Sequence, residues 1–444
     1  MKIVIAGAGE VGTHLAKLLS NENLDIIIID ENRERIASLD ADYNLMTYVG
    51  KPTSFAALRE ASVSGADLFI AVTPPESDNI VACSIAKSMG AKITVARISH
   101  YGFMDAANRP IMTKMGVDRL IYPEYLAAKE MINSLDHSWA RNWFELHGGK
   151  IILVGVKIYD NAPLAGMQLK DFASKTVHFH VSAISRNHET IIPRGDDRML
   201  AGDILYITAT RKYIDELIEL CGKTKHEVKR VLIMGGSKIA VRLVDMAGKR
   251  FRFTIIDNNR AVCNELSEKC PDAEIIYGDA RDTEVLLEAG LEECEGFIAL
   301  SPSSESNILT CLTAKEHGIK KSIAEVEDMQ FLPQAEGLGI GTAINKKLLA
   351  SSSIFQLLLD ADDSSSKCLA LTDAEVAELE VKENTKITRS PVKSLNIDRS
   401  ITLAALIRND EGMLITGNTV FQPGDRVLVF CLAGSLHKVD RLFS

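Results

Sequence analysis

Short runs of β-branched and other apolar residues alternate, along the first 135 residues, with longer stretches in which apolar residues recur at helical spacing. The runs have the length of strands, and the stretches between them are long enough to form crossover helices. A strand that is followed by such a helix pairs in parallel with the next strand, because the helix carries the chain back across a face of the sheet. The pattern therefore predicts an α/β fold with a doubly wound parallel sheet of the Rossmann type. The expected strands are Lys2–Ala6, Asp25–Ile29, Leu45–Val49, Leu68–Val72, Ile93–Ile98 and Arg119–Ile121.

The whole pattern is repeated at an offset of about 228 residues. The apolar run Ile3–Ala6 returns as Val231–Met234, and a glycine-containing turn follows both runs. The second run, Ile27–Asp30, returns as Thr254–Asp257. Because a repeat of this length is far longer than a solenoid unit of about 20 to 50 residues, it predicts two homologous Rossmann-like domains with two related sites.

A smaller unit follows each predicted Rossmann-like domain and is itself repeated. The turn Gly202-Asp203 before an alternating strand corresponds to the turn Gly424-Asp425. A Gly-Asp turn, an alternating strand and a short terminal helix predict a compact α+β domain. The expected order is a first Rossmann-like domain at residues 1–136, a first small domain at 137–226, a second Rossmann-like domain at 227–360 and a second small domain at 361–444.

Two joints and two helices connect these domains. Residues 136–149 and the polar residues 361–367 have the character of linkers. The apolar stretches Tyr125–Leu135 and Leu348–Leu359 predict a helix after each parallel sheet. Either these helices are exchanged between copies of the chain in a dimer, or each covers the core of its own domain.

Composition restricts the class of protein. Hydrophobic residues make up 46% of the 444 residues, yet no apolar run approaches the roughly 18 residues that span a bilayer. No signal segment opens the chain, so we expect a cytoplasmic protein without direct membrane insertion. A net charge of −10 argues against non-specific attraction to nucleic acid or anionic lipid. The eight cysteines lack the spacing of a metal site, which predicts reduced and mostly buried thiols.

The turn after the first strand has the sequence Gly7-Ala-Gly9-Glu-Val-Gly12 and precedes a predicted helix. In this motif the first glycine permits the tight turn, the second lets a pyrophosphate approach the backbone, and the third lets the helix pack on the strand. The N-terminus of the helix offers N–H groups and a positive dipole end to the anion. Asp30 ends the second strand, where a carboxylate accepts ribose hydroxyls and repels a 2′-phosphate. The alternative is a glycine turn that serves packing only. The expected contacts of NAD(H) or an adenine nucleotide are Gly7, Ala8, Gly9, Glu10, Val11, Gly12 and Asp30.

The corresponding turn in the second half keeps the frame but changes the contact residues. Ser237 replaces the second glycine, so the backbone cannot come as close to a pyrophosphate, whereas Lys238 adds a cation. This second site either holds a smaller or differently placed nucleotide such as ATP or ADP, or is degenerate. Arg97, at the end of the fifth strand, is a phosphate contact or a solvated rim charge, and its counterpart is Glu325. The expected residues of the second site are Gly235, Gly236, Ser237, Lys238, Ile239 and Asp257.

The tandem order of a Rossmann-like domain with this glycine motif, a second-strand aspartate and a small domain with a Gly-Asp turn resembles the RCK family, also called KTN, of regulators of potassium transport. The resemblance covers essentially the whole chain. It implies a peripheral homo-oligomeric ring of two or four chains, which binds NAD(H) or ATP and ADP and gates potassium flux through an integral-membrane Trk-type channel subunit. It also implies that Thr73 and Arg97 belong to the first site. Nucleotide binding would then shift the population of ring geometries.

Two other functions remain open for a chain with Rossmann-like domains: an NAD-dependent oxidoreductase and a free-standing nucleotide sensor. A hydride-transfer enzyme needs an acid or a base beside the nicotinamide. His178 and His180 are expected on the exposed face of a strand, and His100 in a surface loop. Because no Ser/His/Asp or paired-carboxylate pattern is present, we expect no enzyme activity, no catalytic residue and no metal ligand.

Overall fold

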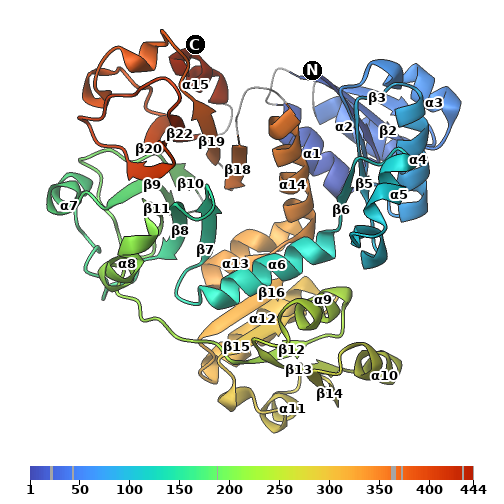
Figure 1. Ribbon diagram of the computed structural model, residues 1–444. Coiled ribbons are helices and arrows are strands. Elements are labelled where there is room, and N and C mark those ends of the chain that lie inside the picture. Colours follow the sequence, from blue (N-terminus) through green and yellow to red (C-terminus); the bar gives the residue numbers. More distant parts are fainter. Residues whose placement is uncertain are drawn as a thin grey trace. The chain divides into compact units, whose positions relative to one another are not determined.

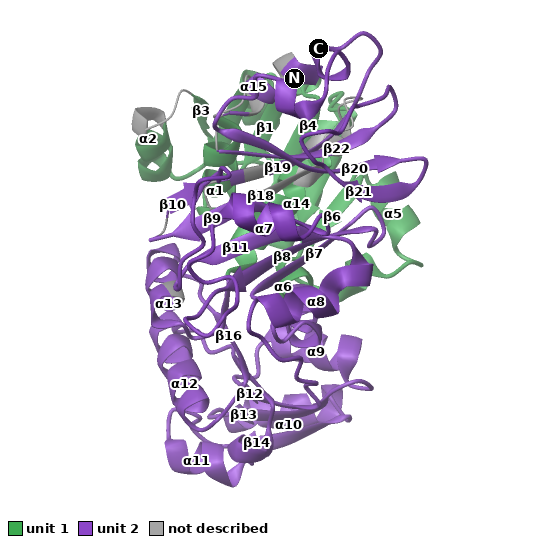
Figure 2. Ribbon diagram, turned by 90° about the vertical axis from the view of Figure 1, so that its left-hand side faces the viewer, with its two compact units in different colours: residues 1–127, 345–361 green, residues 128–344, 362–444 purple. Residues whose placement is uncertain are grey.

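The chain divides into two compact units, residues 1–127 with 345–361 and residues 128–344 with 362–444 (Figures 1 and 2). The first unit contains one parallel sheet, and the second unit contains another parallel sheet and two antiparallel sheets. None of the helices in the described ranges is both long and apolar enough to cross a membrane. The computed structural model describes residues 1–20, 24–42, 45–187, 189–361, 367–371, 374–432 and 435–443.

The parallel sheet of the first unit has the strand order β3-β2-β1-β4-β5-β6. Each strand begins and ends within one residue of its predicted bounds, which confirms the Rossmann-type prediction. The order reverses at β1, which pairs in parallel with β2 on one side and with β4 on the other. Ligands of such sheets bind at this switch point, beyond the carboxyl ends of the strands. The strands are β1 (Lys2–Ala6), β2 (Asp25–Asp30), β3 (Met46–Val49), β4 (Leu68–Ala71), β5 (Ile93–Arg97) and β6 (Arg119–Ile121), and the helices are α1 (Glu10–Ser20), α2 (Arg33–Asp42), α3 (Phe55–Glu60), α4 (Glu76–Ser88) and α5 (Arg109–Lys114).

The second unit repeats this sheet with the order β14-β13-β12-β15-β16-β17. The identical topology confirms the predicted duplication, and continuous burial of the central strands explains their unbroken apolar sequences. The strands are β12 (Arg230–Met234), β13 (Arg252–Asp257), β14 (Ala273–Tyr277), β15 (Gly296–Ala299), β16 (Lys321–Glu325) and β17 (Thr342–Ile344), and the helices are α9 (Lys238–Ala247), α10 (Arg260–Lys269), α11 (Thr283–Glu288), α12 (Ser304–Glu316) and α13 (Leu332–Leu338).

The helix that follows each parallel sheet contributes to the unit of the other sheet. Helix α14 (Lys346–Ala361) comes after β17 in sequence, yet it belongs to the first unit and lies beside α1 (Figure 1). The last residues of α6 (Pro123–Asp136) belong to the second unit, where Ser134 Oγ donates to Thr342 Oγ1 at 3.2 Å. These helices are therefore exchanged between the two units of a single chain, an arrangement that differs from both interpretations of the sequence.

Each small domain contains a five-stranded antiparallel sheet with short helices, which confirms the predicted α+β modules. Residues 136–149, expected as a joint, include the edge strand β7, so the prediction of a linker there is wrong in its second half. Residues 362–366 of the other expected joint lie outside the described residues. The first sheet, of order β10-β9-β11-β8-β7, comprises β7 (Asn142–Leu146), β8 (Ile151–Lys157), β9 (Phe179–Arg186), β10 (Glu189–Ile191) and β11 (Ile204–Ala209), with α7 (Leu169–Lys175) and α8 (Ile214–Leu220). The second sheet, of order β18-β19-β22-β20-β21, comprises β18 (Lys367–Leu371), β19 (Ala374–Glu380), β20 (Ile401–Arg408), β21 (Glu411–Leu414) and β22 (Arg426–Leu432), with α15 (Leu436–Phe443).

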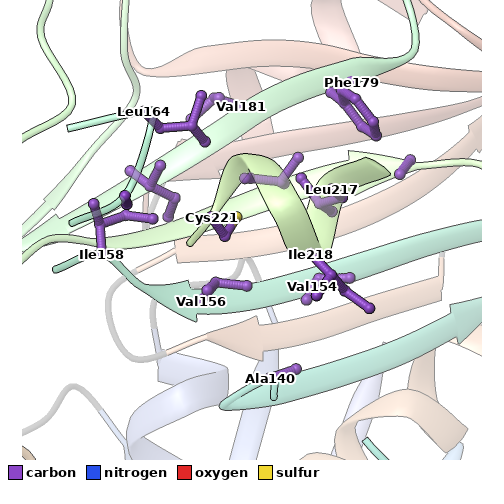
Figure 3. Packing of buried hydrophobic residues seen from close by; sticks show 14 of the residues in the cluster. Ala140, Val154, Val156, Ile158, Leu164, Phe179, Val181, Leu217, Ile218 and Cys221 are labelled. Atoms are coloured by element: carbon purple, nitrogen blue, oxygen red, sulfur yellow. The ribbon is translucent and has the colours of Figure 1, made fainter. Parts of the chain in front are cut away.

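The two small domains share a hydrophobic core in addition to their separate ones. In the core of the first domain, Leu217 and Ile218 of α8 pack over Val154 and Val156 of β8 (Figure 3). The shared core instead combines residues of β8, β9 and β11 with residues of β19, β20 and β22. At its edge, His147 Nε2 lies 2.6 Å from Glu378 Oε1. The two domains therefore form one packed pair.

A partly exposed arginine paired with a buried aspartate explains the aspartate of each repeated Gly-Asp turn. The guanidinium of Arg186 donates from Nε and Nη2 to the two carboxylate oxygens of Asp203, at 2.8 and 2.7 Å. Arg408 donates in the same way to Asp425, at 2.8 and 2.6 Å. These charge-assisted pairs fix the end of one central strand against its neighbour.

Burial of His180 should make the stability of the small-domain pair depend on pH. Burial lowers the pKa of His180 to about 4, and its Nε2 lies 3.1 Å from Thr402 Oγ1. Between an ordinary pKa near 6.5 and the folded value, the unfolded chain binds a proton that the folded chain does not. The free energy of unfolding should therefore fall with decreasing pH in this range, by up to about 3 kcal/mol.

Urea unfolding of wild type and His180→Gln between pH 7 and pH 4.5 tests this expectation. The stability difference between the two proteins should change with pH, while His178→Gln serves as a control at a neighbouring histidine. A difference between wild type and His180→Gln that stays constant over this range would contradict the expectation.

Candidate functional site

A glycine turn closes at the carboxyl end of the central strand in each parallel sheet. Gly7, after β1, has a φ of 115°, and a Cβ there would stand 3.1 Å from the backbone nitrogen of Thr73. Gly235, after β12, has a φ of 98°, and its Cβ would stand 2.9 Å from the carbonyl carbon of Leu300. Both turns require glycine because an L side chain is strained at these angles and has no room.

The other two glycines of the first motif differ in the space around them. A Cβ on Gly12 would stand 1.9 Å from the carbonyl oxygen of Gly7, so this glycine is needed for close packing of α1. A Cβ on Gly9 would meet no atom of the described residues within 4 Å. Open space at the N-terminus of α1 is what an approaching diphosphate requires. Ala8 and Val11 are buried beside this space, and Glu10 is exposed.

An aspartate at the end of the second strand holds each glycine turn. Asp30 is only 7% exposed, and it accepts the N–H of Ala8 at Oδ2 (2.6 Å) and the N–H of Asn32 at Oδ1 (2.8 Å). Asp257 accepts the corresponding N–H groups of Gly236 (2.7 Å) and Asn259 (2.8 Å). Because each carboxylate oxygen accepts more than one hydrogen bond, the same carboxylates retain capacity for ribose hydroxyls.

A buried asparagine forms hydrogen bonds at the carboxyl edge of each parallel sheet, a role that the sequence did not reveal. Asn79 of α4 accepts from the N–H and Oγ1 of Thr73, at 2.8 and 2.7 Å, and donates to the carbonyl oxygens of Thr73 and Arg97, both at 2.9 Å. Asn307 of α12 makes the equivalent four bonds to Ser301 and Glu325. The only signal was the recurrence of an asparagine at the same place in both halves.

Thr73 and Arg97 lie at the carboxyl edge of the first parallel sheet, where the side chain of Asn79 donates to the carbonyl oxygens of both. The hydroxyl and the N–H of Thr73 both donate to Asn79 Oδ1, so this residue is held in place by the asparagine. Arg97 is half-buried, and among the described residues its Nε has no hydrogen-bond partner. Its counterpart, Glu325, is buried. The carboxyl edges of the two parallel sheets therefore carry an arginine and a glutamate at equivalent positions.

A cavity of about 430 Å³ lies over the glycine turn of the second unit. This volume is within the range of small-molecule sites. Of the predicted residues, Ile239 is buried and Lys238 is exposed, and neither lines the cavity. The polar and glycine residues of its wall include Gly235, Gly236, Ser237, Asp257, Asn258, Gly278, Asp279, Arg281, Ser301, Ser303 and Ser306.

Charged and hydroxyl groups in this wall could bind a phosphorylated ligand. Arg281 Nη2 lies 2.6 Å from Asp279 Oδ2, and this hydrogen bond lowers the pKa of the Asp279 carboxyl. Ser237 occupies the N-cap position of α9, and its buried Oγ has no hydrogen-bond partner within the described part of the chain. In the first half the positions of Asp279 and Arg281 are occupied by Lys51 and Thr53, so the sites are not equivalent.

The histidines considered for catalysis occupy other environments. His178 precedes β9 and stacks on Tyr213 with ring centroids 3.6 Å apart, and His180 contacts Thr402 of the other small domain. The prediction that both lie on an exposed strand face is therefore wrong. His100 is exposed and contacts Glu76. Within the described ranges, no three side chains of His, Cys, Asp or Glu converge as a metal site would require.

The fold and the two glycine turns define a protein of two Rossmann-like domains, each followed by a small α+β domain. Residues 3–123 and 231–346 match the model of the TrkA-N domain, and residues 153–222 and 376–444 match that of the TrkA-C domain. The chain thus belongs to the family of proteins with TrkA-N and TrkA-C domains, in tandem duplication, which confirms the RCK-type resemblance.

Curated relatives match the chain from end to end. It is 28% identical over 450 residues to the Trk system potassium uptake protein TrkA of Halomonas elongata, covering 100% of this chain and 98% of the relative. It is 29% identical over 452 residues to a TrkA homolog of Archaeoglobus fulgidus, covering 100% of both chains.

Solved structures of RCK domains share the fold. The GsuK RCK domain matches with a TM-score of 0.61 at 16% identity, over 100% of this chain and 94% of that one. The GsuK channel bound to NAD matches with a TM-score of 0.61 at 16% identity, over 100% of this chain and 78% of that one.

Proposed function

We propose that this protein is a cytoplasmic regulatory subunit that binds nucleotides and gates potassium uptake through an integral-membrane Trk-type channel subunit. The observation that carries the proposal is the pair of aspartate-held glycine turns, at equivalent places in two repeated domains. The end-to-end similarity to TrkA proteins supports the assignment to potassium uptake. We retain the four-domain division at residues 136, 226 and 360 as part of this proposal.

The first site is proposed to bind NAD(H). The open space at Gly9 admits the diphosphate to the N-terminus of α1, and Asp30 accepts the ribose hydroxyls. Arg97 at the same edge supplies a cation for phosphate. The anionic Asp30 favours a ribose with a free 2′-hydroxyl over one with a 2′-phosphate.

The second site is proposed to bind a shorter adenine nucleotide, ATP or ADP. Its cavity has room for a small ligand, but Ser237 has a side chain at the position where Gly9 leaves space. Asp257 keeps the ribose-binding role, and Arg281 in the cavity wall and Lys238 on the first turn of α9 contribute positive charge. Two sites of different selectivity allow one chain to respond to two nucleotide pools.

The response is proposed to be a change in the geometry of a homo-oligomeric ring of two or four chains. A nucleotide that binds one ring geometry more tightly than another shifts the population toward it, by no more than its difference in binding free energy. A membrane partner in contact with the ring would then open or close.

Replacing Gly9 by alanine should weaken NADH binding about tenfold, because the new methyl group occupies the approach of the diphosphate. The fold should be unaffected, since no atom in the described part of the chain lies within 4 Å of that methyl group. Calorimetric titration of the full chain with NADH, NAD, ATP and ADP measures this. Gly65→Ala is the matched control, because its Cβ also meets no atom within 4 Å among the residues that the structure describes. Equal NADH affinity in the two variants would argue against the first site.

Reconstitution tests the regulatory part of the proposal. The full chain would be combined with a Trk-type membrane subunit in liposomes, and potassium flux measured with each nucleotide in turn. We expect the flux to change with the nucleotide added. Flux that is the same with and without the chain under every nucleotide would refute regulation while leaving nucleotide binding intact.

A further inference from the structure

A lysine from the second half of the chain reaches the glycine turn of the first site. Helix α14 lies along α1, and Lys347 Nζ in its first turn is 2.5 Å from Glu10 Oε2. One turn further on, Ser351 is fully buried and its Oγ lies 3.4 Å from the carbonyl oxygen of Val11. The first turn of α14 is thereby fixed beside the first turn of α1.

Glu10 places a carboxylate beside the space that a diphosphate would enter. It follows Gly9 directly, and its carboxylate, 62% exposed, adds negative charge next to the open space. A diphosphate entering this space would be repelled by Glu10 unless a cation offset its charge. Lys347 forms an ion pair with Glu10 and provides that cation.

The ion pair between Lys347 and Glu10 is partly exposed to solvent. Lys347 is partly enclosed, at 22% exposure, whereas Glu10 lies in solvent. Exposed ion pairs of this kind contribute little to stability, because water and salt screen them. A lysine stem is flexible, so its ammonium can move from a carboxylate to a nearby phosphate without moving the helix.

We propose that Lys347 is a phosphate-binding residue of the first site, exchanged from Glu10 to the diphosphate when the nucleotide binds. This inference rests on the proposed function, and it adds that the first site is completed by a helix from the opposite half of the chain. In the absence of nucleotide, the carboxylate of Glu10 takes the place of the phosphate and holds the Lys347 ammonium beside the open space at Gly9.

The two members of the ion pair should affect binding in opposite directions. Lys347→Met should weaken NADH binding about tenfold or more, because a charge-assisted hydrogen bond to phosphate is lost. Glu10→Gln should tighten NADH binding about threefold, because the repulsion between the Glu10 carboxylate and the diphosphate is removed. A merely structural ion pair would make both variants weaken binding alike, since both break the same contact.

NADH fluorescence titration of the full-length wild type, Lys347→Met, Glu10→Gln and the double variant tests the proposal, with Lys114→Met as an exposed lysine control. Raising the salt concentration should reduce NADH affinity less in Lys347→Met than in wild type. The proposal is overturned if Lys347→Met binds NADH as the control does, or if Glu10→Gln weakens binding as much as Lys347→Met does. Absence of NADH binding to wild type would refute the proposed function itself. Loss of binding in Asp30→Ala with no effect of Lys347→Met would refute only the role of Lys347.

Discussion

Replacement of Asp30 by alanine is expected to lower the NADH affinity of the full chain by about a hundredfold. Each charge-assisted hydrogen bond to a ribose hydroxyl contributes about 1.5–3 kcal/mol, and every 1.4 kcal/mol is a factor of ten. The substitution also removes the acceptor of the Ala8 N–H group, which loosens the glycine turn at the diphosphate. Calorimetry with NADH measures the affinity.

Asp257→Ala is the matched control for this change. It removes the same two backbone hydrogen bonds at the equivalent turn of the second unit, so its structural cost should be similar. It should leave NADH affinity at the first site unchanged and weaken ADP instead. If Asp30→Ala binds NADH as tightly as wild type does, Asp30 is not part of an NADH site. If both variants weaken NADH binding equally, the two sites are not distinct.

Replacement of Arg408 by alanine is expected to destabilise the second unit by about 3 kcal/mol, the second large effect. The substitution leaves Asp425, which is only 2% exposed, as a buried carboxylate without its bidentate partner. Removing one member of a buried ion pair costs about 3–5 kcal/mol, because the remaining charge is not solvated. Because Arg408 itself is partly exposed, the lower end of this range is expected.

Thermal unfolding followed by circular dichroism, supported by hydrogen exchange of β20 and β22, would measure this loss. Arg186→Ala in the first small domain should have a similar effect, because it makes the same contact with Asp203. Arg389→Ala removes an exposed arginine of the second small domain and is the control. An Arg408→Ala protein as stable as the control would show that the pair does not hold the strands together.

The two parallel sheets could be predicted from the sequence because their central strands are buried on both faces. Runs such as Ile3–Ala6 and Ile26–Ile29 are buried throughout, so nearly every residue in them is apolar. Strand β7 was missed for the opposite reason. Within the described residues it is an edge strand that pairs with β8 alone, and its partly exposed polar residues resemble those of a linker.

The positions of the glycine turns could be predicted, but the contacts that hold them could not. The motif identifies Gly7 and Asp30, because a tight turn and a ribose carboxylate have recognisable spacing. It does not reveal that Asn79 joins two strand ends, because that role depends on side-chain bonds to distant backbone. Nor does it place Lys347 beside Glu10, since 337 positions separate the two residues.

The position of α14 determines how the two halves of the chain depend on each other during folding. A chain ending after residue 226 would lack α14, so the surface of α1 that buries Ser351 would be left bare. Such a half would need a second molecule to cover that surface, and folding would then depend on protein concentration. Joining the halves in one polypeptide replaces that encounter with an intramolecular one, so neither half has to find a partner before its fold is complete.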